Sequence, residues 1–304
     1  MAEDAVGFAD AAEGRRCTLS TRFQAASISK QLVAACVLLL EEEGVLAISD
    51  PVRSWWDAAP STWGGMTIGH LLANSAGLPH WTAPLDEPGN VPASDEVPAQ
   101  LCRTPLVDSP GERWSYSGPG YVLAAAIVER AAGQPYGRVV HDRILAPLAM
   151  SATSSGWIPA PDEIAHGHRD GREISLLAGL TGLPGTGDLW STAADLLRFA
   201  AACLDRRLLS SRSWSRLTRV HAPLGSEHDA PDETGLVTVG YGYGVYVGTI
   251  DGRSIRYHTG DNPGYRSILA WLPDDGLSFC ALCNDEAASL PRALSNALTN
   301  ELEP

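Results

Sequence analysis

The chain has 304 residues, of which 44% are hydrophobic and 19% are charged, and its formal net charge is −14. This composition is typical of a globular protein with a large core, and the acidic balance argues against nucleic acid or an anionic membrane as a partner. The longest apolar run follows Gln31 and is too short to cross a bilayer. The N-terminal stretch is acidic and lacks the basic start and apolar run of a secretory signal, so we expect a cytoplasmic protein.

The apolar pattern predicts helices over most of the chain before residue 236. A helix is expected over residues 27–46, where the middle is apolar on all sides and Gly44 offers a C-cap. This helix is expected to be buried at the centre of the protein, with Ser27 near its N-terminus. Three further helices are predicted between loops rich in proline and glycine, at 67–77, 117–134 and 191–207. Ser191 is the candidate N-cap of the last one.

From residue 236 the sequence changes to β-branched and aromatic runs separated by short turns, which is typical of an antiparallel meander. A last helix is predicted over 289–303. We therefore predict an α+β fold, an antiparallel sheet flanked by helices with an inserted all-helical lobe. The α/β lobe is expected to comprise residues 1–45 and 236–304, and the mainly helical lobe residues 46–235, with the active-site cleft between them.

The six cysteines and eight histidines form no clear disulfide or metal pattern. The cysteines are scattered, which suits a reducing compartment. Cys280 and Cys283 have zinc or redox spacing, but they lie in a predicted buried strand and no second pair completes a site, so we interpret them as core residues. His166 and His168 lie in a polar loop and are interpreted as solvated, with metal binding as the less favoured alternative. We therefore predict no metal and no cofactor.

The chain contains one lysine, Lys30, among its 22 basic residues. Arginine stays protonated at any working pH, whereas lysine can lose its proton when it is desolvated or close to other cations. Ser27 and Lys30 are three residues apart and would share one face of a helix. Free N–H groups at the helix start would favour an oxyanion at Ser27, and a neutral Lys30 could take its proton. The alternative is that Lys30 is an ordinary surface cation.

The stretch SISK, followed by an apolar helix that ends EEEGVLAISDPV, resembles the serine beta-lactamase and penicillin-binding-protein superfamily. The resemblance is strongest to the branch of class C beta-lactamases and DD-peptidases, which also contains esterases, D-aminopeptidases and transacylases. Four other stretches agree in order: TIGHLLANSAGLPHW (67–81), PGERWSYSGPGYVLAAAIVE (110–129), GDLWSTAADLLRF (187–199) and YHTGDNPGYRS (257–267). Ordered matches from about Gly7 to Asn284 are far more specific than one S-x-x-K tetrad, and they imply a beta-lactamase-like fold.

The resemblance implies the catalytic roles. Ser27 would be the nucleophile, and Lys30 would lower its proton affinity. Tyr116, in the stretch YSG, would carry the proton to the leaving group, either as a tyrosinate or as a relay with Lys30. The oxyanion hole would be formed by the backbone N–H groups of Ser27 and Asp261.

The resemblance also implies a set of substrate-binding residues. His258 matches the cationic first position of the family's third motif, and Thr259 and Gly260 match the edge strand that follows it. Two tryptophans, Trp114 and Trp157, are further candidates for the lining of an apolar acyl pocket.

Three features depart from the family pattern. Gly118 replaces an asparagine that normally exchanges hydrogen bonds with the amide side chain of a penicillin or peptide, although it keeps its place in the predicted substrate site. Asp261 puts a carboxylate next to the oxyanion hole, which is tolerable only if the side chain points away or meets a cation such as Arg266. Finally, few residues precede Ser27, so we expect either missing edge strands or a missing segment.

We predict a metal-free serine catalyst that forms an acyl-enzyme on Ser27 from an ester, thioester or amide of a small molecule. The loss of the asparagine at Gly118 favours an esterase or transacylase over a D-stereospecific peptidase, an amidase or a beta-lactamase. A non-catalytic module that keeps the fold is the alternative from another class, and a cysteine-dependent enzyme lacks a cysteine with a histidine partner. The expected partners are a small acyl donor and an amine or alcohol acceptor, without nucleic acid or membrane, and the oligomeric state is open.

Overall fold

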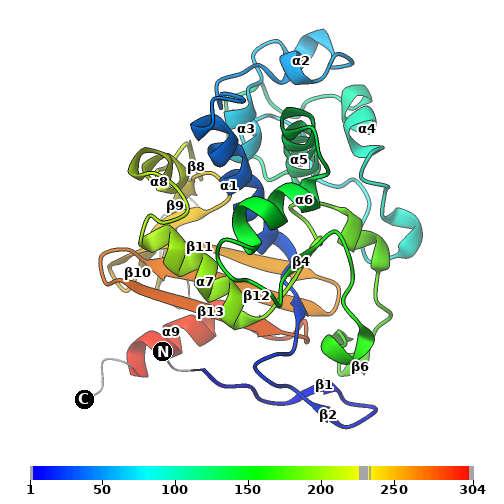
Figure 1. Cartoon of the computed structure of the whole chain (residues 1–304), viewed down its shortest axis with the longest axis vertical. Coiled ribbons are helices and arrows are strands. Elements are labelled where there is room, and N and C mark those ends of the chain that lie inside the picture. Colours follow the sequence, from blue (N-terminus) through cyan, green and yellow to red (C-terminus); the bar gives the residue numbers. More distant parts are fainter. Residues whose placement is uncertain (1–2, 226–231, 233, 301–304) are drawn as a thin grey trace.

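A six-stranded antiparallel sheet crosses the middle of the molecule (Figure 1). The computed structural model describes residues 3–225, 232 and 234–300. The strand order is β13-β12-β11-β10-β9-β8, and neighbouring strands are antiparallel. The strands are β8 (Ala222–Pro223), β9 (Leu236–Tyr241), β10 (Tyr246–Ile250), β11 (Arg253–Asn262), β12 (Tyr265–Leu272) and β13 (Leu277–Cys283). The meander predicted from residue 236 is thus confirmed.

The two faces of the sheet are covered by two separate hydrophobic cores, because successive side chains of a strand point to opposite faces. Leu269 and Trp271 of β12 belong to the core that contains α1 (Ser29–Glu42). Ile268 and Ala270, which alternate with them, belong to the core that contains α9 (Leu290–Asn300). The last helix is therefore present as predicted, and the predicted residues 301–303 lie outside the described residues.

The first helix is the buried centre of the larger core. Residues 29–38 of α1 are all buried, and α5, α6 and α8 pack around the helix. Gly44 follows the C-cap with a φ of 72°, and its N–H donates to Glu41 O at 3.0 Å. The other helices are α2 (Val52–Trp55), α3 (Ile68–Leu72), α4 (Val97–Arg103), α5 (Gly118–Ala132), α6 (Tyr136–Val140), α7 (Ala193–Leu204) and α8 (Ser211–Thr218). Short helical turns are η1 (Ala26–Ile28), η2 (Ser61–Trp63), η3 (Pro88–Asn90), η4 (His141–Leu145), η5 (Pro161–Glu163) and η6 (Ala178–Gly182).

Within the described residues three small sheets accompany the large one, and one of them, β3-β7-β4, connects the chain's beginning with its middle. They are formed by β1 (Phe8–Asp10), β2 (Arg15–Arg16), β3 (Phe23–Gln24), β4 (Ser154–Ser155), β5 (His168–Arg169), β6 (Arg172–Glu173) and β7 (Leu189–Ser191). Ser191 pairs with Phe23 in the sheet β3-β7-β4, so it is not the cap of α7. The cap is the next residue, Thr192, whose Oγ1 accepts a hydrogen bond from Asp195 N at 3.3 Å.

Helix α7 packs on β12 and β13, although it lies within the stretch 46–235 that the sequence assigned to the helical lobe (Figure 1). The division into lobes at residues 45 and 236 stays a prediction. The α+β class, an antiparallel sheet flanked by helices, is confirmed.

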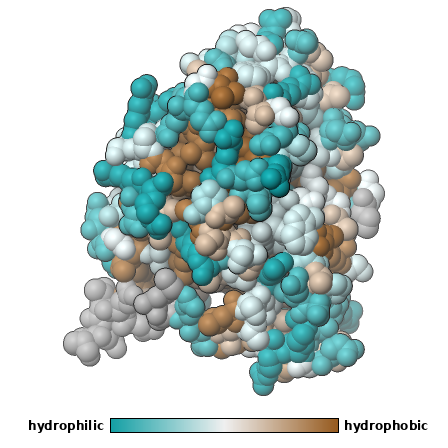
Figure 2. All heavy atoms as spheres, in the orientation of Figure 1, coloured by the Kyte–Doolittle hydropathy of each residue, from teal (hydrophilic) through white to brown (hydrophobic). Residues whose placement is uncertain are grey.

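Hydrophilic side chains cover most of the face in Figure 2, and hydrophobic ones show between them mainly in the upper left of the view. Within the described residues, the structure has no helix whose length and hydrophobicity would suit a membrane span.

Candidate active site

Ser27 lies on a tight turn just before the central helix. The 3₁₀ turn η1 follows β3, and Ala26 has a φ of 48°, a left-handed conformation that residues other than glycine rarely adopt. Ser27 therefore precedes the first residue of α1, Ser29, instead of lying within the helix as the sequence predicted. Strand β11 runs beside this turn, and Ser267 Oγ of β12 donates a hydrogen bond to Ala25 O at 2.7 Å.

Gly260 is the residue that allows β11 to approach the turn so closely. A Cβ atom at this position would lie 2.5 Å from Ala25 O and 2.9 Å from Ala26 Cβ, which is far inside normal contact distance. Gly260 itself is not among the cleft-lining residues, whereas its neighbours Thr259 and Asp261 are. Its function in the site is therefore to bring these neighbours beside Ser27.

Two polar groups converge on the hydroxyl of Ser27. Lys30 Nζ donates to Ser27 Oγ at 2.9 Å, and Tyr116 OH donates to the same oxygen at 2.8 Å. Lys30 is only 1% exposed, donates also to Gly185 O, and lies 4.8 Å from the ring centre of Tyr116. Lys30 is thus no surface cation. The three residues that the sequence assigned to catalysis lie within hydrogen-bond distance of one oxygen.

Tyr116 is held by the start of α5. Ser117 is the N-cap of this helix, and its Oγ accepts a hydrogen bond from Gly120 N at 3.0 Å. The N–H of Ser117 donates to Asn74 Oδ1 at 3.0 Å. Trp114 packs near Tyr116, with 6.3 Å between ring centres, but it lines a different depression and not the cleft.

His258 differs from the sequence prediction in its charge. Its Nδ1 lies 2.6 Å from Thr259 O, which can only accept, so Nδ1 carries the proton. Its Nε2 lies 2.9 Å from the hydroxyl of Tyr241 and is free to accept from it. Burial, together with the nearby charge of Lys30, lowers the pKa of His258 to about 3. The predicted cationic first position of the third motif is therefore a neutral imidazole with both nitrogens engaged.

The carboxylate of Asp261 is paired with Arg266 and is largely exposed. Arg266 Nη1 lies 2.6 Å from Asp261 Oδ1, and 75% of the Asp261 side chain is exposed. A carboxylate at Asp261 was expected to be compatible with an oxyanion hole only if it pointed away or met a cation such as Arg266. The ion pair with Arg266 meets this condition. Ser27 and Asp261 both line the cleft, and their backbone N–H groups as the oxyanion hole stay a prediction.

The cleft around Ser27 has a volume of about 710 Å³. One wall is formed by β10 and β11, through Tyr246, His258 and Thr259, and the opposite wall by residues 80–86. Lys30 is the single lysine or arginine among the lining residues that the structure describes. Trp157, in contrast, is 56% exposed and lines another depression.

Residues 80–86 occupy the space that a side chain at position 118 would need. A Cβ atom on Gly118 would lie 2.6 Å from Trp81 Nε1 and 3.2 Å from His80 Cε1. The N–H of Gly118, at the first position of α5, donates to His80 Nδ1 at 3.1 Å. Neither His80 nor Trp81 was predicted to line the site. The only signal was their position at the end of the matched stretch 67–81.

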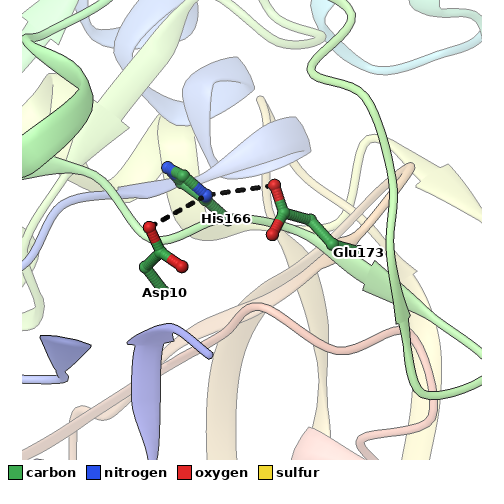
Figure 3. A group of neighbouring side chains, drawn as sticks. All are labelled: Asp10, His166 and Glu173. Atoms are coloured by element: carbon green, nitrogen blue, oxygen red, sulfur yellow. Dashed lines mark hydrogen bonds and ion pairs between the residues drawn. The ribbon is translucent and has the colours of Figure 1, made fainter. Parts of the chain in front are cut away.

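The cysteine pair and the histidine loop lie outside the cleft lining. Cys280 packs against the core of α1, whereas Cys283 packs against the core of α9, so the two thiols face different sides of β13. Figure 3 shows His166 between two carboxylates, with Nδ1 at 3.1 Å from Glu173 Oε1 and 3.6 Å from Asp10 Oδ2. Among the described residues this group has the geometry to hold a metal ion. Ion pairs between His166 and the two carboxylates explain the same arrangement without a metal ion.

The family sequence model described as Beta-lactamase matches residues 2–301, nearly the whole chain. The chain belongs to the Beta-lactamase family. Penicillin-binding protein 4* of Bacillus subtilis (strain 168) is 28% identical over 310 residues, which cover 92% of this chain and 64% of that protein. Esterase EstB of Burkholderia gladioli is 35% identical over 188 residues, which cover 55% of this chain and 47% of the esterase. The chain thus spans about half to two thirds of these relatives.

The fold of this Beta-lactamase family member is also that of solved structures. The D-amino acid amidase of Ochrobactrum anthropi SV3 superposes with a TM-score of 0.82 and 25% identity, covering 97% of this chain and 89% of the amidase. The beta-lactamase-like fold that the sequence resemblance implied is therefore confirmed.

Proposed function

We propose that this protein is a serine hydrolase or acyltransferase that forms an acyl-enzyme on Ser27 and that acts on esters with an uncharged leaving group. The observation that carries the proposal is the convergence of Lys30 Nζ and Tyr116 OH on Ser27 Oγ, at 2.9 and 2.8 Å. A serine hydroxyl becomes a useful nucleophile when an adjacent group takes its proton, and both candidates are in place.

The reaction follows from this geometry. Ser27 Oγ attacks the acyl carbon, and its proton passes to Tyr116 as a phenolate stabilised by the charge of Lys30, or to Lys30 once that amine has lost its own proton. Tyr116 then gives a proton to the departing oxygen or nitrogen as the bond to the acyl carbon breaks. Water or another nucleophile cleaves the acyl–Ser27 ester in a second step that returns the hydroxyl to Ser27. Water as acceptor gives hydrolysis, and an alcohol or amine gives acyl transfer.

The charge pattern of the cleft supports an uncharged leaving group. We place the leaving group at the end of the cleft that His258 and Tyr246 line, where the ring centres of Tyr116 and His258 are 6.2 Å apart. A peptide or penicillin would bring a carboxylate to this end, where His258 is neutral and both its nitrogens are engaged. Burying a carboxylate without a cation at that end is costly, so D-Ala-D-Ala peptides and penicillins are disfavoured.

One observation favours a second candidate, a D-amino acid amidase. Asp86 lines the opposite end of the cleft, and its carboxylate lies 3.6 Å from Arg169, which is closer to Glu286 at 3.0 Å. A carboxylate with so loose a partner suits the ammonium group of an amino acid amide. The amide leaving group is also uncharged, so the argument from His258 does not exclude this substrate.

A matched pair of substrates tests the proposal. N-acetyl-D-alanyl-D-lactate and its methyl ester share the scissile ester and differ in the terminal charge, and release of N-acetyl-D-alanine is followed for both. We expect kcat/KM to be roughly tenfold or more higher for the methyl ester, and turnover of both to vanish in Ser27→Ala. A preference for the free acid would contradict the proposal and support a carboxypeptidase. Faster turnover of D-alanine amide than of either ester would support the amidase.

A further inference from the structure

The wall of residues 80–86 offers the substrate a hydrogen-bond donor whose identity can be worked out from its contacts. The N–H of Gly118 donates to His80 Nδ1 at 3.1 Å. A nitrogen that accepts cannot carry a proton, so the proton of this imidazole lies on Nε2. Within the described residues Nε2 has no hydrogen-bond partner of its own, and the ring lines the cleft.

The local structure holds this ring in one orientation. Gly118 is the first residue of α5, and its N–H has no partner within the helix, so His80 satisfies a donor that would otherwise be free. The ring also packs edge-on against Tyr116, with 5.2 Å between ring centres and an interplanar angle of 80°. The residue is exposed, so its Nε2–H is accessible to a ligand in the cleft.

The position of the ring determines which part of a substrate it meets. The proposed function places the leaving group toward His258, although the ring of Tyr116 is nearer to His80 than to His258, at 5.2 against 6.2 Å between ring centres. The acyl chain therefore extends the other way, along Trp81 and Leu85, which are half-buried and line the same wall. His80 is the polar residue that an acyl chain meets first on this path.

Resting on the proposed function, we propose that His80 is a specificity-determining residue whose Nε2–H donates a hydrogen bond to an oxygen of the acyl chain. Because the group donates and does not accept, the protein selects acyl donors that carry an ether, hydroxyl or carbonyl oxygen near the acyl carbon. Purely aliphatic acyl groups of the same size offer this donor no acceptor, so they gain nothing from it.

Two p-nitrophenyl esters of equal length test this inference. The methoxyacetate carries an ether oxygen where the butyrate carries a CH₂ group. The methoxyacetate is also more reactive in solution, so the quantity compared is the ratio of the two kcat/KM values in wild type, His80→Phe and His80→Gln. We expect the ratio to fall roughly tenfold in His80→Phe, and to stay within about threefold of wild type in His80→Gln, which keeps an N–H donor. His141→Phe, at an exposed position, is the control that leaves the ratio unchanged.

Labelling of Ser27 by a fluorophosphonate separates the possible outcomes. If His80→Phe is labelled at the wild-type rate but keeps the wild-type ratio, the inference is wrong while the proposed function stands. If wild type reacts with neither ester nor fluorophosphonate, both are wrong. Should His80→Phe fold poorly, ¹⁵N NMR of the wild-type imidazole gives a second test. Protonation at Nε2 between pH 6 and 8 supports the inference, and protonation at Nδ1 overturns it.

Discussion

The amine of Lys30 is enclosed by two hydrogen-bond acceptors and two tyrosine rings. Its Nζ donates to Ser27 Oγ and to Gly185 O, and it lies 4.8 and 5.4 Å from the ring centres of Tyr116 and Tyr121. A guanidinium in this space would bring a larger planar fork that cannot serve as a base. The single lysine of the chain therefore lies beside the proposed nucleophile.

Lys30→Arg is predicted to lower kcat/KM for ester hydrolysis by about 10²–10⁴-fold, close to the effect of Ser27→Ala, because general base catalysis at Ser27 is lost. The measurement is hydrolysis of p-nitrophenyl butyrate alongside circular dichroism. Arg53→Lys, an exchange of the same two residue types at an exposed position, should retain full activity. Near-normal activity of Lys30→Arg would show that Lys30 is not the base.

The neutral state of His258 predicts a pH dependence of stability. The unfolded chain binds a proton at the usual histidine pKa of 6.5, whereas the folded chain does so only at about pH 3. The free energy of unfolding is therefore at its full value above pH 6.5 and falls as the pH drops from 6.5 toward 3, by about 2 kcal/mol between pH 6.5 and 5. Urea unfolding at both pH values should show this slope in wild type and a smaller one in His258→Gln. An equal slope in the two proteins would mean that His258 is charged when folded.

At the scale of elements, the site depends on the close approach of β11 to the turn η1. Gly260→Ala is predicted to destabilise the protein by about 1–3 kcal/mol, because its Cβ would overlap Ala25 O and Ser267 Oγ. Activity should fall further than stability explains, since Asp261 moves away from Ser27. Gly65→Ala, where the added Cβ meets no atom within 4 Å, is the matched control for thermal unfolding and ester hydrolysis. A Gly260→Ala protein as stable and active as this control would contradict the account.

The sequence predicted the elements where the apolar pattern is strong. The buried helix α1 and the strands from residue 236 follow from long runs of apolar or β-branched residues. The predictions were wrong at element boundaries that are set by pairing between segments distant in the sequence. Serine and threonine are both suitable N-cap residues, but the pairing of Ser191 with Phe23 places Ser191 in strand β7, and Thr192 caps the helix. Ser27 likewise lies on a separate turn, since β11 fixes the path of the chain there.

At the scale of the whole molecule, the larger hydrophobic core is continuous from the sheet to the helices. It includes Trp271 of β12, Leu38 of α1 and Ile127 of α5. We therefore expect one calorimetric unfolding transition, with the calorimetric and van't Hoff enthalpies equal within error, despite the two lobes expected from the sequence. Two resolved transitions would show that the lobes unfold independently.

The chemistry of the candidate site could be predicted only in part. Ser27, Lys30 and Tyr116 belong to contiguous motifs, and the structure brings them together. The charge of His258 depends on Tyr241, and the orientation of His80 depends on Gly118, which are contacts between distant segments. No local spacing in the sequence contains this information, and Trp114 shows the converse error, because it is next to the YSG stretch but faces another depression.

Intact-mass spectrometry of wild type and Ser27→Ala after incubation with a fluorophosphonate, a p-nitrophenyl ester and benzylpenicillin tests the central claim most directly. We expect the fluorophosphonate and the ester each to add one acyl or phosphonyl mass to wild type. We expect no added mass on Ser27→Ala, and no lasting adduct with benzylpenicillin on either protein. An ester adduct that persists in Ser27→Ala, or wild type unmodified by every probe, would contradict a nucleophilic Ser27.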